Sequence, residues 1–193
     1  MVVALQDEDC LFCLVGGHAA SLYRAQERFT RDVDFAILTS PPKKSRSVAS
    51  SALRAIGLRP IVGFIPLSST EEERKSICMV TSEPPTGHAT GLVDVLLPEL
   101  PWVKNAVLRA QNNLIDLGFA HVPVITPEDL LIAKCFSFRN APDRFQDLDD
   151  LKEILTHVED LDIDYLMRTL DGFSLVIPEQ VRKFAPKGIL REE

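Results

Sequence analysis

The chain has 193 residues, of which 46% are hydrophobic and 25% are charged, so it can bury a core and is not a wholly disordered protein. Its net charge of -7 argues against a broad nucleic-acid-binding face. No apolar run reaches the length of a membrane span, and the first residues, MVVALQDEDC, lack the basic and apolar regions of a signal peptide. We therefore expect a cytoplasmic protein that does not have a membrane as a partner.

The N-terminal part alternates strand and helix patterns. Residues 10–15 (CLFCLV) are typical of a short buried strand, and residues 16–26 begin with two glycines that turn into a helix. Residues 33–38 (VDFAIL) predict a second strand, and residues 47–57 predict a helix that ends at Gly57. Extended or strand segments follow at 58–66, 76–82 and 92–97, separated by a charged loop or short helix at 68–74 and a loop at 83–91.

Helix patterns dominate after Pro101. The predicted helices are residues 101–113, 126–138, 143–158 and 162–170, and residues 114–125 read as extended. Thr126 is the expected N-cap of the second of these helices, with Pro127 at its first position, and this helix is expected to be amphipathic. The pattern predicts an α/β fold with a mixed sheet flanked by helices in residues 1–122 and a C-terminal helical part in residues 123–193. The alternative is that both parts form one compact unit.

Three aspartates lie in or beside the predicted strands. Asp32 and Asp34 are two residues apart, so a strand would project both carboxylates from the same face. Asp94 is the acidic residue of the apolar segment GLVDVLL, and burial of an unpaired carboxylate is costly. If the two strands are neighbours, the three carboxylates converge on a site suited to hard divalent metal ions. The alternative is that all three lie at strand ends and face water.

Gly16 and Gly17 end the first apolar strand and precede a helix. Glycine permits a tight turn at such a position, and the backbone N–H groups that follow can point toward an anion. This arrangement is the outline of a phosphate-binding turn. The alternative is an ordinary turn, since most glycine pairs have no binding role.

Two motifs in sequence order carry a family resemblance. The segment LVGGHAASLY…RFTRDVDFAIL, with Arg28, Thr30, Asp32 and Asp34, resembles the signature of the DNA polymerase beta superfamily of nucleotidyltransferases, and most closely its AbiEii-type branch, which includes abortive-infection toxins. The later segment VITPEDLLIAKCFSFRNAPDRFQDLDDL is similar to the second signature of that branch, with Lys134, Arg144, Asp147 and Asp150 at the matching positions. The resemblance covers most of residues 11–155.

The resemblance implies a nucleotidyltransferase fold and a nucleotide-binding site. Gly16, Gly17, Arg28, Thr30 and Lys134 would bind a nucleoside triphosphate. Asp32, Asp34 and Asp94 would bind Mg²⁺ or Mn²⁺, and Asp94 would also be catalytic, as a ligand of the metal near the attacking hydroxyl or as the base that deprotonates it. Lys134 would neutralise phosphate charge, and Asp147 would orient Lys134.

The implied reaction moves a nucleoside monophosphate onto an acceptor, with release of pyrophosphate. The acceptor is open between RNA, including a tRNA end, a protein and a small molecule, and an antitoxin is a candidate partner. Two other functions remain open at this point. One is a non-catalytic, nucleotide-binding or antitoxin-like module on the same fold, and the other is a plain α/β interaction domain whose acidic side chains are solvated.

Overall fold

The apolar segments of the N-terminal part form one five-stranded sheet. A computed structural model describes residues 1–26, 29–64, 77–83 and 92–186. The strands are β1 (Cys10–Val15), β2 (Val33–Thr39), β3 (Pro60–Phe64), β4 (Ile77–Ser82) and β5 (Val93–Leu96). Phe12, Cys13, Leu14 and Val15 are all buried, which is expected of a strand covered on both faces.

The sheet has the strand order β1-β2-β5-β4-β3. Only the pairing of β2 with β5 is parallel; the other three pairings are antiparallel. In the parallel pairing Asp34 is directly opposite Asp94, and Thr81 of β4 is opposite Asp94 on its other side. This confirms the predicted mixed sheet and makes the two aspartate-bearing strands neighbours.

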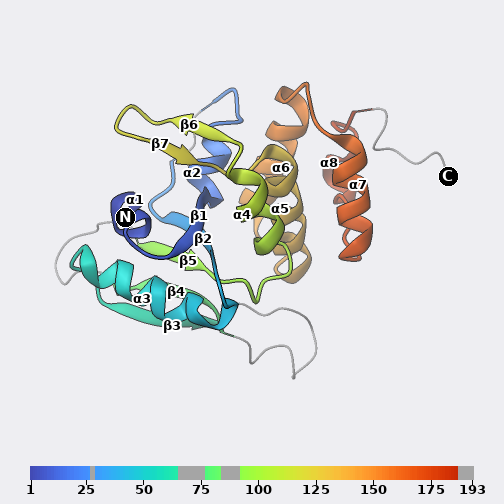
Figure 1. The fold of residues 1–193 in the computed structure, drawn as a ribbon. Coiled ribbons are helices and arrows are strands. Elements are labelled where there is room, and N and C mark those ends of the chain that lie inside the picture. Colours follow the sequence, from blue (N-terminus) through green and yellow to red (C-terminus); the bar gives the residue numbers. More distant parts are fainter. Residues whose placement is uncertain (27–28, 65–76, 84–91, 187–193) are drawn as a thin grey trace.

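Helices α3 (Ser45–Ala55) and α4 (Val103–Ala110) pack on the sheet through a few buried small and apolar side chains. Helix α3 follows the short 3-10 helix η1 (Pro42–Lys44) and buries Ala49, Ala52 and Leu53 against β2, β3 and β4. It ends as expected, because Gly57 has a φ of +80° and its N–H donates to the carbonyl oxygen of Arg54. Helix α4 packs on β1 and β2 (Figure 1).

The C-terminal helices are arranged around α5 (Pro127–Asn140). In Figure 1, α6 (Phe145–His157) and α7 (Ile163–Gly172) lie away from α3, and both contact α5. Helix α8 (Glu179–Arg182) contacts α6. Thr126 caps α5 as predicted, since its hydroxyl accepts from the N–H of Asp129 at 3.4 Å. The expected amphipathic character of α5 is wrong, because α5 contacts α2, α4, α6 and α7 and is buried over most of its surface.

The observed elements differ from the expectation in three places. Helix α1 (Val2–Gln6) was not expected, and it buries Leu5 against the core. Helix α2 (Gly16–Ser21) ends before residue 26, and the side chains of Tyr23 and Arg24 beyond it bond distant parts of the chain. Residues 114–125 form a hairpin of β6 (Leu114–Asp116) and β7 (His121–Pro123) instead of one extended segment.

Some expectations are not tested by this fold. The predicted segments 68–74 and 83–91 lie mainly or wholly outside the described residues. Buried residues of the sheet and of α5–α7 belong to one hydrophobic cluster, and β7 spans the proposed boundary at residue 122, so the division into two parts stays a prediction. Among the described helices, none combines the length and apolarity that crossing a bilayer requires.

Candidate functional site

Three carboxylates converge where β2 and β5 begin. Asp34 and Asp94 are paired across the parallel register, and Asp32 directly precedes β2. Asp32 Oδ1 accepts a hydrogen bond of 3.1 Å from the N–H of Leu92, which directly precedes β5. The aspartates therefore lie together because β5, far away in sequence, is inserted beside β2.

The environment of Asp34 disfavours its charged form. Burial, followed by the charge of Asp94, raises the pKa of Asp34 to about 7, while Lys134 and the backbone N–H of Gly17 act in the opposite direction. Burial also raises the pKa of Asp94, which Thr81 partly offsets. Asp94 Oδ1 is buried and has no hydrogen-bond partner of standard geometry among the described residues. This pair would be stabilised by a cation.

Gly16 lies against Asp34, and no other residue fits at this position without strain. Its φ is +67°, a conformation that L side chains rarely adopt. A Cβ on Gly16 would lie 2.7 Å from Cβ of Asp34 and still closer to the carboxylate oxygen Oδ2. The glycine therefore lets the β1–α2 turn approach the carboxylates, and whatever binds them, at backbone distance.

Lys134 faces the carboxylates from α5. It is only 7% exposed, and its Nζ contacts Asp147 Oδ1 at 2.9 Å and Asp150 Oδ2 at 2.7 Å. The other oxygen of Asp147 accepts from the Ser137 hydroxyl at 2.8 Å and lies 3.3 Å from Arg144 Nε. Two carboxylates of α6 bind the Lys134 ammonium and so fix its position. From there its charge acts on Asp34.

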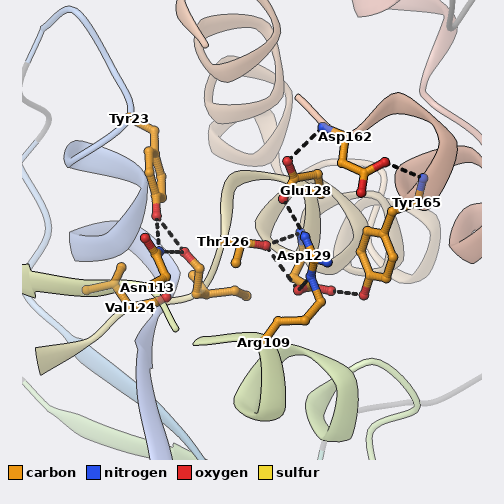
Figure 2. Close-up of polar contacts among 10 residues, drawn as sticks. Tyr23, Arg109, Asn113, Val124, Thr126, Glu128, Asp129, Asp162 and Tyr165 are labelled. Carbon is orange, nitrogen blue, oxygen red and sulfur yellow. Dashed lines mark hydrogen bonds and ion pairs between the residues drawn. The ribbon is translucent and has the colours of Figure 1, made fainter. Parts of the chain in front are cut away.

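A second polar cluster anchors the first turn of α5 (Figure 2). Asp129 accepts from the Tyr165 hydroxyl at 2.6 Å, from Arg109 Nε at 3.0 Å and from the Thr126 hydroxyl at 3.1 Å. Arg109 also contacts Glu128 at 3.0 Å and stacks on the Tyr165 ring. These contacts connect α4, α5 and α7, so each charge buried here has a partner.

A smaller group joins the β1–α2 segment to the chain before α5. The Tyr23 hydroxyl donates to the carbonyl oxygen of Ile125 at 2.8 Å, and the amide of Asn113 donates to the Tyr23 oxygen and to the carbonyl oxygen of Val124 (Figure 2). The N–H of Ile125 also donates to Leu14. The strand that leads into the glycine turn is therefore held to the segment that enters the helix carrying Lys134.

The three aspartates, the glycine turn and Lys134 line one cleft with a volume of about 440 Å³. Its polar lining consists of Gly16, Gly17, Thr30, Asp32, Asp34, Asp94, Lys134, Ser137, Asn140, Arg144, Gln146 and Asp147. Its apolar lining includes Met79, Leu96, Leu100, Trp102, Leu130 and Phe136. The cleft falls within the size range of small-molecule and cofactor sites.

All of the predicted site residues that the structure describes line this cleft. Arg28 lies outside the described residues. Sequence reasoning missed Arg24, which binds Asp150, and the Arg109–Asp129–Tyr165 contacts. No local pattern would have found them, because each pair joins residues that are far apart in the chain.

The donor chemistry of the three aspartates fits a hard divalent cation. Carboxylate oxygens are the ligands that Mg²⁺ and Mn²⁺ prefer, and the charge of Asp94 raises the pKa of the half-buried Asp34 although Lys134 partly offsets it. Within the described ranges, no set of three or more His, Cys, Asp or Glu side chains is already arranged around a metal position. The fit therefore concerns the type of donor atoms, and not a finished coordination geometry.

Comparison with known proteins relates the cleft to a family. A family model described as "Nucleotidyl transferase AbiEii toxin, Type IV TA system" matches residues 2–184. No curated protein matches the chain significantly in sequence.

Solved structures resemble the chain at low sequence identity. The antibiotic-resistance factor ANT(2'')-Ia is 14% identical over 88% of this chain and 86% of that chain, with a TM-score of 0.53. An antigenic nucleotidyltransferase-like protein from Paracoccidioides brasiliensis is 17% identical over 80% and 72% of the two chains, with a TM-score of 0.48. The lincosamide antibiotic adenylyltransferase LnuA is 16% identical over 75% and 87%, with a TM-score of 0.42. The likeness to ANT(2'')-Ia supports the predicted fold.

Proposed function

The chain belongs to the AbiEii family of nucleotidyltransferase toxins, and we propose that it transfers a nucleoside monophosphate from a nucleoside triphosphate to an acceptor hydroxyl in a metal-dependent reaction. The acceptor oxygen forms a bond to the α-phosphorus, and the bond from that phosphorus to the β-phosphate oxygen breaks. Pyrophosphate leaves with the electron pair. This reaction depends mainly on positioning and on charge neutralisation.

Asp32, Asp34 and Asp94 hold Mg²⁺ or Mn²⁺ in this proposal. The single observation that carries it is the pairing of Asp34 with Asp94 in the parallel register. Burial and the charge of Asp94 raise the pKa of Asp34, and burial and the charge of Asp32 raise the pKa of Asp94. A bound divalent ion supplies positive charge to the phosphate oxygens that react. Asp94 has two roles open to it: it ligates the ion near the attacking hydroxyl, or it accepts the proton of that hydroxyl.

The phosphates lie against the glycine turn and Lys134. Gly16 and Gly17 let the backbone approach the phosphates closely, since even one methyl group on Gly16 would collide with Asp34. Lys134 neutralises phosphate charge from α5, and Asp147 orients it through the contact of 2.9 Å. Thr30 lines the same cleft, and Arg28 stays a predicted phosphate ligand outside the described residues.

The acceptor remains open between RNA, a protein and a small molecule. The antibiotic-resistance function of ANT(2'')-Ia makes a small-molecule acceptor worth testing, and the net charge of -7 makes a long RNA less favourable. Because the family model describes a Type IV toxin–antitoxin system, an antitoxin is the proposed protein partner.

The function is tested by measuring nucleotide binding and transfer on the same samples. Each nucleoside triphosphate is titrated into wild type and Asp34→Asn by calorimetry, with Mg²⁺ and with EDTA, and α-³²P-labelled nucleotides are then incubated with RNA, protein and small-molecule acceptors. We expect binding that needs both Mg²⁺ and Asp34, together with label on one acceptor class. Binding without label on any acceptor would favour the non-catalytic module, and no binding would contradict the proposal.

A further inference from the structure

We propose that Arg24 is a positioning residue that keeps the charge of Lys134 available to the triphosphate, and that it acts through Asp150. Arg24 does not line the cleft and so does not touch a bound nucleotide there. The inference rests on the proposed function, because it states that a residue outside the cleft raises the affinity of the cleft for the phosphates.

Asp150 forms a bridge between the two cations. Its side chain is 0% exposed; Oδ1 lies 2.7 Å from Arg24 Nη1, and Oδ2 lies 2.7 Å from Lys134 Nζ. The Arg24 side chain is itself only 7% exposed, and its Nη2 contacts Asp149 at 2.7 Å. One buried carboxylate is thus shared between a cation at the cleft and a cation behind it.

The balance of charges explains why this sharing matters. Lys134 contacts two carboxylates, those of Asp147 and Asp150, and on its own it would be outweighed by them. A site with net negative charge at this point would repel phosphate oxygens. Arg24 offsets Asp150 from a buried position, whereas Arg144, which lies beside Asp147, is 56% exposed and more strongly screened by solvent.

Arg24 also joins the segment after the glycine turn to the helices that carry and hold Lys134. Arg24 follows α2, the helix that begins with Gly16 and Gly17, while Asp150 belongs to α6 and Lys134 to α5. The neighbouring Tyr23 bonds the chain just before α5. Tyr23 and Arg24 therefore link the segment after the glycine turn to the chain just before α5 and, through Asp150, to Lys134.

The test compares Arg24→Gln with wild type, using a nucleoside triphosphate, inorganic pyrophosphate and the matching nucleoside as probes. Loss of the charge is expected to weaken triphosphate and pyrophosphate binding roughly tenfold, as for other close charge pairs, and to leave nucleoside binding unchanged. KM for the triphosphate should rise more than kcat falls. Arg54→Gln on α3 is the matched control for net charge, and Asp149→Asn removes only the exposed partner of Arg24; both should stay within about twofold of wild type.

A double variant separates the charge effect from a structural one. The double variant Arg24→Gln/Asp150→Asn also lacks the carboxylate that Arg24 offsets. Its affinity for pyrophosphate should therefore lie within about threefold of that of Asp150→Asn alone. This comparison decides the matter even if Arg24→Gln alone does not fold. The role of Arg24 would be overturned if wild type and folded Arg24→Gln bound pyrophosphate equally. It would also be overturned if the double variant bound pyrophosphate more than about threefold more weakly than Asp150→Asn. No nucleotide binding by wild type would overturn the proposed function as well.

Discussion

Two groups of acidic residues, one buried at the start of α5 and one half-buried at the cleft, differ in how their charges are compensated. Glu128 and Asp129 at the start of α5 are bonded by Arg109, with Tyr165 and Thr126 as further donors to Asp129. Asp34 and Asp94 face each other across two strands, and Asp94 Oδ1 lacks a partner of standard geometry among the described residues. The carboxylates of the first group have donors within the protein, although burial still raises the pKa of Asp129, whereas one oxygen of the second group has none of standard geometry among the described residues.

The two groups are connected through α5. The Arg109 contacts hold α5 to α4 and α7, and α5 carries Lys134 to the pair of Asp34 and Asp94. Substitutions in the first group should therefore lower stability, and substitutions in the second should lower activity.

The largest effect is expected for Asp34→Asn. Removal of this carboxylate should lower the transfer rate about a thousandfold, because the metal loses a ligand, while stability in metal-free buffer stays the same or rises with the repulsion gone. Single-turnover transfer and urea unfolding measure the two effects. Asp7→Asn, at an exposed site after α1, is the control for net charge. A parallel loss of stability and activity would place Asp34 with the structural group.

Asp129→Asn should show the opposite behaviour. The amide cannot replace the carboxylate as acceptor for both Arg109 and Tyr165, and a guanidinium loses a buried partner. The free energy of unfolding should fall by about 3 kcal/mol, measured by urea denaturation. The exposed Asp164→Asn on α7 should change it by less than about 0.5 kcal/mol. If Asp129→Asn instead abolished transfer at unchanged stability, the comparison between the two groups would fail.

A smaller effect concerns the pH dependence of stability in metal-free buffer. The pKa of Asp34 is about 7 in the folded chain against 3.8 for an ordinary aspartate, so the folded state binds this proton more tightly. Its contribution to stability is complete below pH 3.8 and is lost as the pH rises toward 7.

Thermal scans of wild type and Asp34→Asn between pH 5 and pH 8 test this expectation. The Tm of the variant relative to wild type should increase by a few degrees over this range, since about 1 kcal/mol corresponds to roughly 2–4 °C for a chain of this size. Saturating Mg²⁺ should reduce the difference by stabilising the ionised carboxylate. Parallel curves for the two proteins would show that Asp34 does not titrate in this range.

The sequence by itself determined the local elements and the chemical character of the site. Apolar runs, the N-cap at Thr126 and the stop at Gly57 identified most strands and helices, because these patterns act within a few residues. The glycine pair and the aspartates of RDVDF pointed to a nucleotide site because their spacing is local as well. Helix α1 was missed, since so short a segment is stabilised by packing and not by its own propensity.

Only the tertiary structure decided which residues meet. The insertion of β5 beside β2 places Asp94 opposite Asp34, and the packing of α5 buries a lysine that an amphipathic helix would have left in water. The partners of Arg24 and Arg109 come from helices far along the chain. Register and helix packing depend on burial summed over the whole core, which no short stretch of sequence encodes, so the charge balance around Lys134 becomes visible only in the folded chain.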